Sequence, residues 1–303
     1  MSLNKQPRDT YRPQSADLEV GRASAAGMYN VYQGGLGLVW ADWDAAQKVM
    51  RAGRGEVPIA ARENARFAAR AAAWAARAYG IEQVLDIGVS LVEGIQVPTV
   101  EEAVRGAVPA ARVLACDNNP VVIRHAQAWR GSPDSGYEHV FLGDVRAVEQ
   151  ILSHPELTRR FRRDRPVLVA LVAVLHFVAE AEDPVGILTR LGEGLPEGSV
   201  LVFSHACAPE ADPAAAAMAA GYENASSDLT FRTEPAVAAM LQEAGWEVTD
   251  PGVTDVQRWA PPGERYRGEP SPSVRVVGAV ATRPRVGGRA ESRARAARSE
   301  RRP

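Results

Sequence analysis

Residues 84–117, VLDIGVSLVEGIQVPTVEEAVRGAVPAARVLACD, predict a βαβ unit around which the rest of the chain is organised. A short apolar strand ends on Asp86 and is followed by Gly88. An amphipathic helix over 99–108 then leads to a second apolar strand that ends on Asp117. In an open parallel sheet the ligand crevice lies at the carboxyl ends of the strands. A carboxylate there can accept hydrogen bonds from both hydroxyls of a ribose, so the unit predicts a cradle for a nucleoside cofactor.

The loop after the first strand separates two classes of cofactor. A dinucleotide site requires Gly-x-Gly-x-x-Gly, whereas residues 88–94 read GVSLVEG, and Glu93 would repel a diphosphate. S-adenosylmethionine carries no phosphate, and its ammonium group can bind an acid such as Asp86. These acids therefore favour S-adenosylmethionine over NAD. The competing interpretation is a βαβ unit with incidental acids, because one glycine is a weak signal.

Composition indicates an ordinary soluble globular protein. The 303 residues are 46% hydrophobic and 24% charged, and the formal net charge is −2, so nothing in the overall charge predicts nucleic-acid binding. The two cysteines lack the spacing of a metal site, and we predict no metal centre. No apolar run resembles a signal peptide or a membrane span, so we expect a cytoplasmic protein without a membrane partner.

The chain predicts one domain over 24–282. A flexible segment, 1–23, precedes it, and a disordered basic tail, 283–303, follows it because such a composition cannot bury enough apolar surface. Within the domain, residues 24–80 predict an N-terminal helical lid. Residues 208–233 predict an insertion on the substrate side of the crevice.

Later strands bring more side chains to the same edge of the sheet. The third strand is followed by Asp144, which could bind the exocyclic amine of adenine or cap the next helix. The most apolar run, 167–175, predicts a central strand that delivers His176. The strand predicted at 199–203 is followed by His205. A lone histidine is as readily structural as functional, but two adjacent strands that both end on histidine favour a function.

The N-terminal region offers two further candidates. Tyr29 and Tyr32 lie close to the glycine pair at 34–35, and they are interpreted either as part of a lid over a cofactor or as core aromatics. The helix predicted over 59–79 carries an apolar stripe at helical spacing. Asn64, on the polar side of this helix, could reach a cofactor carboxylate.

Several segments together resemble the S-adenosyl methyltransferase family of actinomycete-type bacteria, formerly catalogued as a domain of unknown function. They are MYNVYQGG, ARENARF, IEQVLDIG, ACDNNPVV, GDVR, LVAVLHFV, GSVLVFSHA and DPGVTDVQRWAP. The resemblance implies the α/β, Rossmann-like fold of class I methyltransferases. We therefore expect a mostly parallel seven-stranded sheet with helices on both faces and an N-terminal helical extension. It also implies S-adenosylmethionine as the cofactor.

The resemblance also implies roles for individual residues. Asp86 and Gly88 are expected at the methionine moiety, Asp117 at the ribose and Asp144 at the adenine. Asn118 and Val145 are also expected to bind the cofactor. His176 and His205 match histidines of the family, and either could remove a proton from the acceptor, with Tyr29 orienting that acceptor. We expect a small-molecule acceptor rather than a nucleic acid.

The chain departs from the family pattern in three places. The late Trp-Arg-Pro of the family is Trp259-Ala260-Pro261 here. Residues 36–39 read LGLV where the family usually has Lys-Asp-Asn-Phe, and DIGVSLVE replaces DIGTGLPT, so that Ser90 stands at the second glycine. These changes leave open a non-methylating member that binds a metabolite or a protein partner. The sequence thus predicts an S-adenosylmethionine-dependent methyltransferase, with that alternative. An NAD-dependent oxidoreductase is a distant third.

Overall fold

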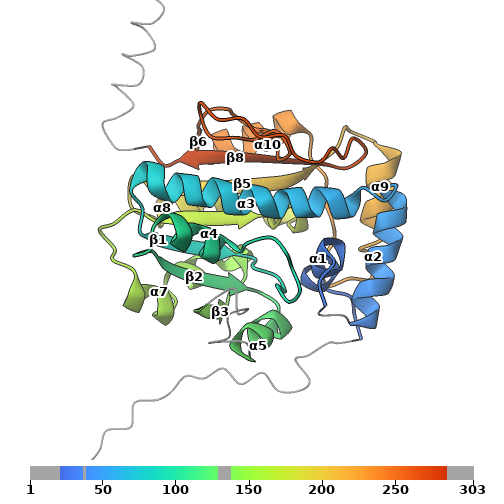
Figure 1. Cartoon of the computed structure of the whole chain (residues 1–303), viewed down its shortest axis with the longest axis horizontal. Coiled ribbons are helices and arrows are strands. Elements are labelled where there is room, and N and C mark those ends of the chain that lie inside the picture. The colour runs from blue at the N-terminus through green and yellow to red at the C-terminus, as the bar shows by residue number, and fades with distance from the viewer. Residues whose placement is uncertain (1–20, 37–38, 129–137, 285–303) are drawn as a thin grey trace, which may run out of the picture.

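The computed structural model describes residues 21–36, 39–128 and 138–284, which form one mixed β-sheet with helices on both faces (Figure 1). The strands are β1 (Gln83–Ile87), β2 (Arg112–Asp117), β3 (Val140–Leu142), β4 (Leu168–Val172), β5 (Val200–Cys207), β6 (Glu247–Val248), β7 (Thr254–Asp255) and β8 (Arg275–Thr282). Their order is β3-β2-β1-β4-β5-β8-β6, and β7 pairs with β8. Strands β1 to β5 run parallel, and β8 is antiparallel to its neighbours. The predicted Rossmann-like class is confirmed, with the short β7 added to the seven strands expected.

Helices fill the connections between the strands. They are α1 (Ala25–Gln33), α2 (Trp40–Ala52), α3 (Val57–Tyr79), α4 (Val100–Ala107), α5 (Pro120–Ala128), α6 (Val148–Leu152), α7 (Pro155–Arg160), α8 (Pro184–Glu193), α9 (Pro213–Ala220) and α10 (Glu234–Glu243). Three 3-10 turns are η2 (Val145–Ala147), η3 (Leu175–Phe177) and η4 (Glu180–Glu182). Figure 1 shows α1, α2 and α9 gathered at one end of the sheet. None of the helices in the described part of the chain is long and apolar enough to cross a membrane.

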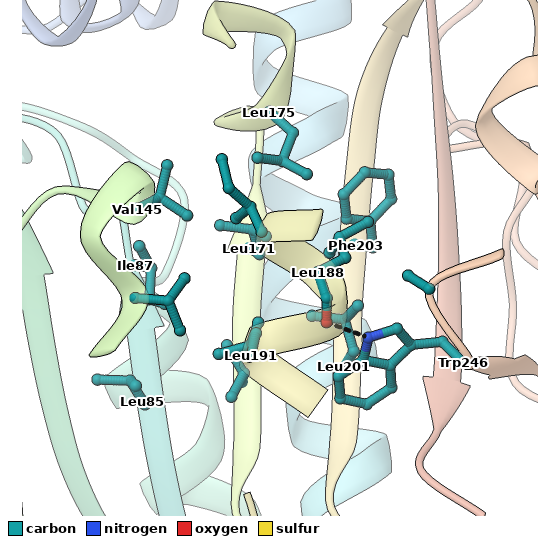
Figure 2. Close-up of a cluster of buried hydrophobic side chains, with 14 of the residues drawn as sticks. Leu85, Ile87, Val145, Leu171, Leu175, Leu188, Leu191, Leu201, Phe203 and Trp246 are labelled. Atoms are coloured by element: carbon teal, nitrogen blue, oxygen red, sulfur yellow. Dashed lines mark hydrogen bonds between the residues drawn. The ribbon is translucent and has the colours of Figure 1, made fainter. Parts of the chain in front are cut away.

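One face of the sheet packs against α8. Successive strand side chains alternate between the two faces, so Leu85 and Ile87 of β1 point to the same side. There they join Phe203 of β5 in an apolar cluster (Figure 2). Leu188 of α8 belongs to this cluster, and its carbonyl accepts a 3.0 Å hydrogen bond from the indole N–H of Trp246. This bond satisfies a polar group that burial would otherwise make costly.

A helix was predicted over 59–79 from its apolar stripe, and in the structure α3 covers the opposite face of the sheet. Ala71 and Ala75 are fully buried against the sheet, and their small side chains allow the helix to approach it closely. The large ring of Phe67 fits between helix and sheet because Gly278 of β8 faces it. A Cβ built on Gly278 would fall 2.6 Å from the Cζ atom of Phe67.

Strand β5 is longer than predicted, and this corrects the place of His205. The strand was expected to end at 203, but it continues to Cys207 because each of its residues pairs with β8. His205 therefore lies inside the sheet, opposite Val277 and fully buried, rather than beyond the end of a strand. His176 does follow its strand, in the turn η3. The predicted terminal segments, 1–23 and 283–303, lie almost wholly outside the described residues, and their boundaries stay predictions.

The contact between α3 and β8 predicts the effect of filling Gly278. We expect Gly278→Ala to lower the free energy of unfolding by about 1–3 kcal/mol, because the buried Phe67 ring cannot give way without disturbing its neighbours. Urea denaturation measures the change. Gly106→Ala is the control: this glycine is exposed in α4 and a Cβ there meets nothing within 4 Å, so we expect a gain of about 0.5–1 kcal/mol. Equal effects of the two changes would contradict this account.

Candidate functional site

A cleft opens beside α1, beyond the carboxyl ends of β1 to β4. It encloses about 740 Å³ of empty space, counting the solvent at its mouth. Its walls are built by α1, by the ends of β1 to β4 with the turns that follow them, and by the insertion. The lining residues are Ala25, Ala26, Tyr29, Ile87, Gly88, Ser90, 117–119, 143–146, 172–174, Phe177, Ser226 and Ser227. A second hollow shares Tyr29, Gly88 and Ser90 with the cleft and extends to Asp86. The two hollows adjoin at these shared residues, and together they form the candidate site.

The predicted acids come together in this site. Asp86 lies near the end of β1, Asp117 is the last residue of β2, and Asp144 lies just after β3. These three strands are adjacent, and each acid lines one of the two hollows. Asn118 and Val145 line the cleft beside them. The structure therefore brings the three predicted carboxylates to one edge of the sheet.

The turn after β1 has a left-handed backbone at two positions. Gly88 has φ +85°, and a Cβ there would fall 2.3 Å from Cγ2 of Val174, so a side chain would close the cleft. Ser90 has φ +61°, which is uncommon for a residue other than glycine. This backbone explains why glycine suits position 90. Ser90 compensates with its hydroxyl, which donates to the carbonyl of Ala26 at 2.9 Å.

Asp117 holds this turn from the next strand. Its Oδ2 accepts a hydrogen bond from the Ser90 N–H at 3.1 Å, and its Oδ1 accepts one from the Asn119 N–H at 2.8 Å. The backbone N–H of Asn118 also contributes a hydrogen bond, and a carboxylate with about four acceptor sites can still accept one more donor. Burial raises the pKa of Asp117 to about 6, although the backbone N–H donors act in the opposite direction. The buried carboxyl is thus suited to a ligand that donates hydrogen bonds, such as a diol.

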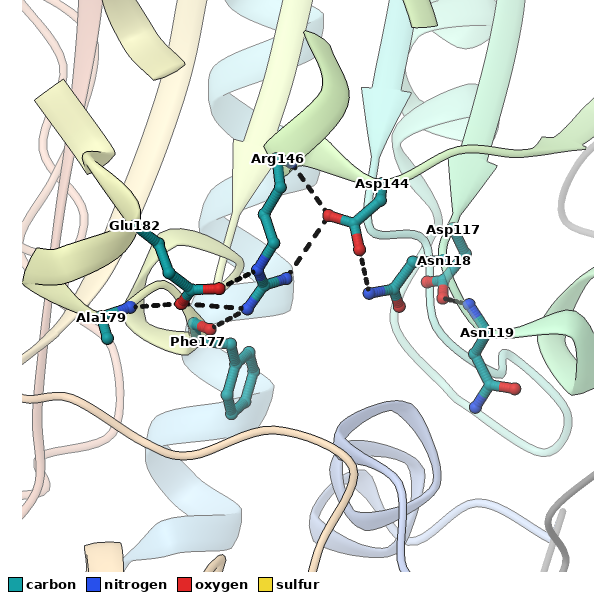
Figure 3. Close-up of polar contacts among 8 residues, drawn as sticks. All are labelled: Asp117, Asn118, Asn119, Asp144, Arg146, Phe177, Ala179 and Glu182. Carbon is teal, nitrogen blue, oxygen red and sulfur yellow. Dashed lines mark hydrogen bonds and ion pairs between the residues drawn. The ribbon is translucent and has the colours of Figure 1, made fainter. Parts of the chain in front are cut away.

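Asp144 both caps a turn and lines the cleft, so the two predicted readings are compatible. Its Oδ1 accepts from the backbone N–H of Arg146 at 2.9 Å, at the start of η2. Its Oδ2 accepts from the Asn118 side chain at 3.1 Å (Figure 3). The Arg146 guanidinium lies beyond it and donates to the Phe177 carbonyl at 2.6 Å and to Glu182.

Tyr29 lines both hollows, but its hydroxyl is already engaged. The hydroxyl donates to the carbonyl of Ala61 at 3.1 Å and accepts from the Asn64 amide at 2.8 Å. Burial raises the pKa of Tyr29 to about 12. Asn64 in turn accepts from the hydroxyl of Ser204 at 2.7 Å and does not line either hollow. Asn64 therefore orients Tyr29, and neither side chain is placed as a proton acceptor.

The two histidines lie behind the wall of the cleft and line neither hollow. His205 donates from Nδ1 to the carbonyl of Ala206 at 2.7 Å, and its Nε2 accepts from Arg232 at 2.7 Å. Burial lowers the pKa of His205 to about 3, so the ring is neutral. The Nδ1 of His176 accepts from the Ala206 N–H at 3.2 Å, and burial likewise lowers the pKa of His176. These contacts assign both rings to support of the wall.

Arg232 links that wall to the insertion. Its guanidinium also donates to the carbonyls of Leu175 and Val178, and the N–H of Thr230 donates to the carbonyl of His176. The segment that carries Ser226 into the cleft is thereby tied to the turn after β4. The insertion was predicted to shape the substrate side, but the residues that do so were not singled out.

Other residues of the site were also missed. Arg146 stands in the GDVR segment and Phe177 directly follows His176, so proximity to predicted residues was the available signal. Leu36, where the chain departs from the family pattern, is 68% exposed and lines neither hollow. Its N–H donates to the carbonyl of Glu93, and residues 37–38 lie outside the described residues.

Comparison with known proteins identifies the family to which the chain belongs. Among solved structures, a DUF574 family protein from Streptomyces avermitilis is 30% identical with a TM-score of 0.78, and the alignment covers 88% of this chain and 100% of that one. A candidate methyltransferase from Thermobifida fusca is 24% identical with a TM-score of 0.77, covering 91% and 100%. No curated protein matches the chain. A family model described as S-adenosyl methyltransferase matches residues 11–284, and the chain belongs to the S-adenosyl methyltransferase family.

Proposed function

We propose that this S-adenosylmethionine-dependent methyltransferase acts on a small molecule that binds in the outer part of the cleft. The observation that carries the proposal is that Asp86, Asp117 and Asp144 line two adjoining hollows at one edge of the sheet. Neighbouring strands lie about 4.8 Å apart, so carboxylates after three of them follow a line of roughly 10 Å. A line of that length suits an extended ligand with an ammonium group at one end and an adenine at the other.

The cofactor residues follow the order of the strands. Asp144 and Val145, after β3, are assigned to the adenine, and Asp117 and Asn118, after β2, to the ribose. Asp86, at the end of β1, is assigned to the ammonium group. The raised pKa of Asp117 supports the ribose assignment, because hydroxyl donors would stabilise the carboxylate that burial disfavours.

The acceptor side of the cleft lies after β4 and under the insertion. Val174 and Phe177 supply an apolar wall there, and Ser226 and Ser227 supply hydroxyls. The sulfonium supplies the activated methyl group when the cofactor is bound. These residues then have to align the acceptor with it and exclude water. Neither histidine lines the cleft, so neither is placed to remove a proton from the acceptor.

The alternative is a family member that binds the cofactor without transferring a methyl group. Ser90 favours it, because a left-handed residue with a side chain replaces glycine in the turn that borders both hollows. Against it, the hydrogen bonds of Ser90 to Ala26 and Asp117 keep the turn in place.

Ligand binding tests the cofactor residues. We expect S-adenosylhomocysteine to bind, and Asp117→Ala to weaken its binding by roughly tenfold to a hundredfold, because hydrogen bonds to charged groups contribute about 1.5–3 kcal/mol. Titration calorimetry measures both, with circular dichroism to verify folding. Asp164→Ala is the control, since this exposed carboxylate pairs with Arg162 far from the cleft. Absence of binding to the unaltered protein at millimolar ligand would reject the proposal.

The pKa of Asp117 predicts a pH dependence. The carboxyl has a pKa of about 6 in the free fold, and ribose donors should lower it in the complex, so binding is coupled to loss of a proton. We expect affinity for S-adenosylhomocysteine to fall as the pH drops below about 6, by up to tenfold for each pH unit. Near pH 6, calorimetry in two buffers of different ionisation enthalpy should show proton release. Asp117→Asn should abolish both effects, and their persistence in that variant would contradict the assignment.

In the ligand-free fold, the raised pKa of Asp117 makes folding stability, unlike ligand affinity, fall as the pH rises. A pKa above the ordinary value of 3.8 contributes stability at low pH, which is lost as the pH rises through about 6. Bound ligand should offset this loss.

Methyl transfer separates the proposal from the alternative. We expect methyl-labelled S-adenosylmethionine to yield a labelled compound in the small-molecule fraction of a Streptomyces lysate, detected by mass spectrometry. Asp117→Ala should give less product, because it binds less cofactor. Label in the macromolecular fraction alone would contradict a small acceptor. Binding without any labelled product would support the alternative.

A further inference from the structure

We propose that Arg146 is a positioning residue that holds the adenine side and the acceptor side of the cleft in a fixed relation. The inference rests on the proposed function. Arg146 lines the cleft between Asp144, which follows β3, and Phe177, which follows β4, and its guanidinium contacts both (Figure 3). Arg146 and Phe177 are 31 residues apart in the sequence, so their contact joins segments that follow different strands.

The guanidinium uses its fork to reach these partners. Nη1 lies 3.4 Å from Oδ1 of Asp144, and Nη2 donates to the Phe177 carbonyl at 2.6 Å. Nε donates to Oε1 of Glu182 at 2.6 Å, and Nη2 lies 3.5 Å from the other oxygen of that carboxylate. A planar group with donors at fixed angles can make these contacts together, whereas a lysine ammonium cannot.

Glu182 holds the guanidinium in place from the other side. Its Oε2 accepts from the backbone N–H of Ala179 at 2.8 Å, at the start of η4. Hydrogen bonding to Arg146 lowers the pKa of Glu182, so the pair is charged at neutral pH. Since the segment between Phe177 and Glu182 contributes both a carbonyl and a carboxylate, Arg146 fastens this whole turn to η2.

The contacts also determine what Asp144 can offer a ligand. An ionised carboxylate has about four acceptor sites. Two of these acceptor sites, on Oδ1, are used by the backbone N–H and by Nη1 of Arg146. One acceptor site on Oδ2 is used by the Asn118 amide. One site on Oδ2 is left, which suits a single donor such as the exocyclic amine of adenine. Arg146 therefore turns Oδ2, rather than Oδ1, toward the ligand.

On the acceptor side, Arg146 acts through the backbone. The Phe177 carbonyl is held by the guanidinium, and the same residue lines the cleft. Its ring lies 5.5 Å from that of Tyr222, which precedes Ser226 in the insertion. A shift of the turn would therefore move the wall against which the acceptor packs. The guanidinium of Arg146 therefore contacts both the adenine side and the acceptor side of the cleft.

A comparison of two ligands tests the adenine side. The probes are S-adenosylhomocysteine and its purine-riboside analogue, which lacks the exocyclic amine. We expect the unaltered protein to prefer the first by about tenfold, because the amine donates to a charged acceptor. Arg146→Met should bind S-adenosylhomocysteine about tenfold more weakly and should have lost the preference, so that the two probes differ by less than about twofold. A merely structural effect would weaken both probes equally and leave the preference intact, which would overturn the proposal.

Two further variants complete the test. Arg162→Met removes an exposed guanidinium that pairs with Asp164 away from the cleft, and it should bind both probes as the unaltered protein does. Arg146→Lys keeps the charge without the fork, and we expect it to resemble Arg146→Met. Full recovery with lysine would overturn the role of the fork. If the unaltered protein binds neither probe, the proposed function fails, whereas a preference that Arg146 variants retain rejects only this inference.

Amide hydrogen exchange tests the acceptor side. Arg146→Met should speed exchange in peptides that cover 175–182, while peptides from α10 should exchange as before, because α10 packs mainly against α8 and β6 and shares none of the hydrogen bonds of Arg146 given above. Unchanged exchange over 175–182 would overturn the link to the acceptor wall.

Discussion

Hydrogen bonding between neighbouring parallel strands is the constraint on which the whole site depends. Ile87 of β1 is held opposite Cys116 of β2 on one side and Leu171 of β4 on the other. Each connection between parallel strands must return along a face of the sheet, so β1 to β4 all end at the same edge. The loops that follow them therefore share one hollow. Acids from three separate strands can contact one ligand only because these strands end at the same edge of the sheet.

Much of the fold could be predicted because its signals are local. The capping box of Thr99 and Glu102 begins α4, and the apolar run that contains β4 reads as a fully covered strand. The end of β5 could not be predicted in the same way. That strand continues past Phe203 because β8, far later in the chain, pairs with it as far as Cys207. A pattern within a few residues carries no information about such a partner.

The candidate site divides along the same line. An acid at the end of a strand could be placed from the strand alone, and Asp86, Asp117 and Asp144 do lie at one edge of the sheet. The remaining roles depend on distant partners. Asn64 is 140 residues from Ser204, whose hydroxyl donates a hydrogen bond to the Asn64 side-chain oxygen. The Nε2 of His205 accepts a hydrogen bond from Arg232 of the insertion. For the same reason, the GDVR segment indicated Asp144 but not the contact of its arginine with Glu182.

The hydrogen bonds of Arg232 have a consequence for how such a protein can change. They fasten the far end of the insertion to residues 175–178 and to β5, and α9, in the first half of the insertion, packs against α2. Between these attachments, Ser226 and Ser227 line the cleft, whereas Tyr222 is buried and its hydroxyl pairs with that of Tyr32 in α1. Substitutions at the two serines can therefore alter the shape of the cleft at one point, while a change at Tyr222 would also disturb the packing of α1.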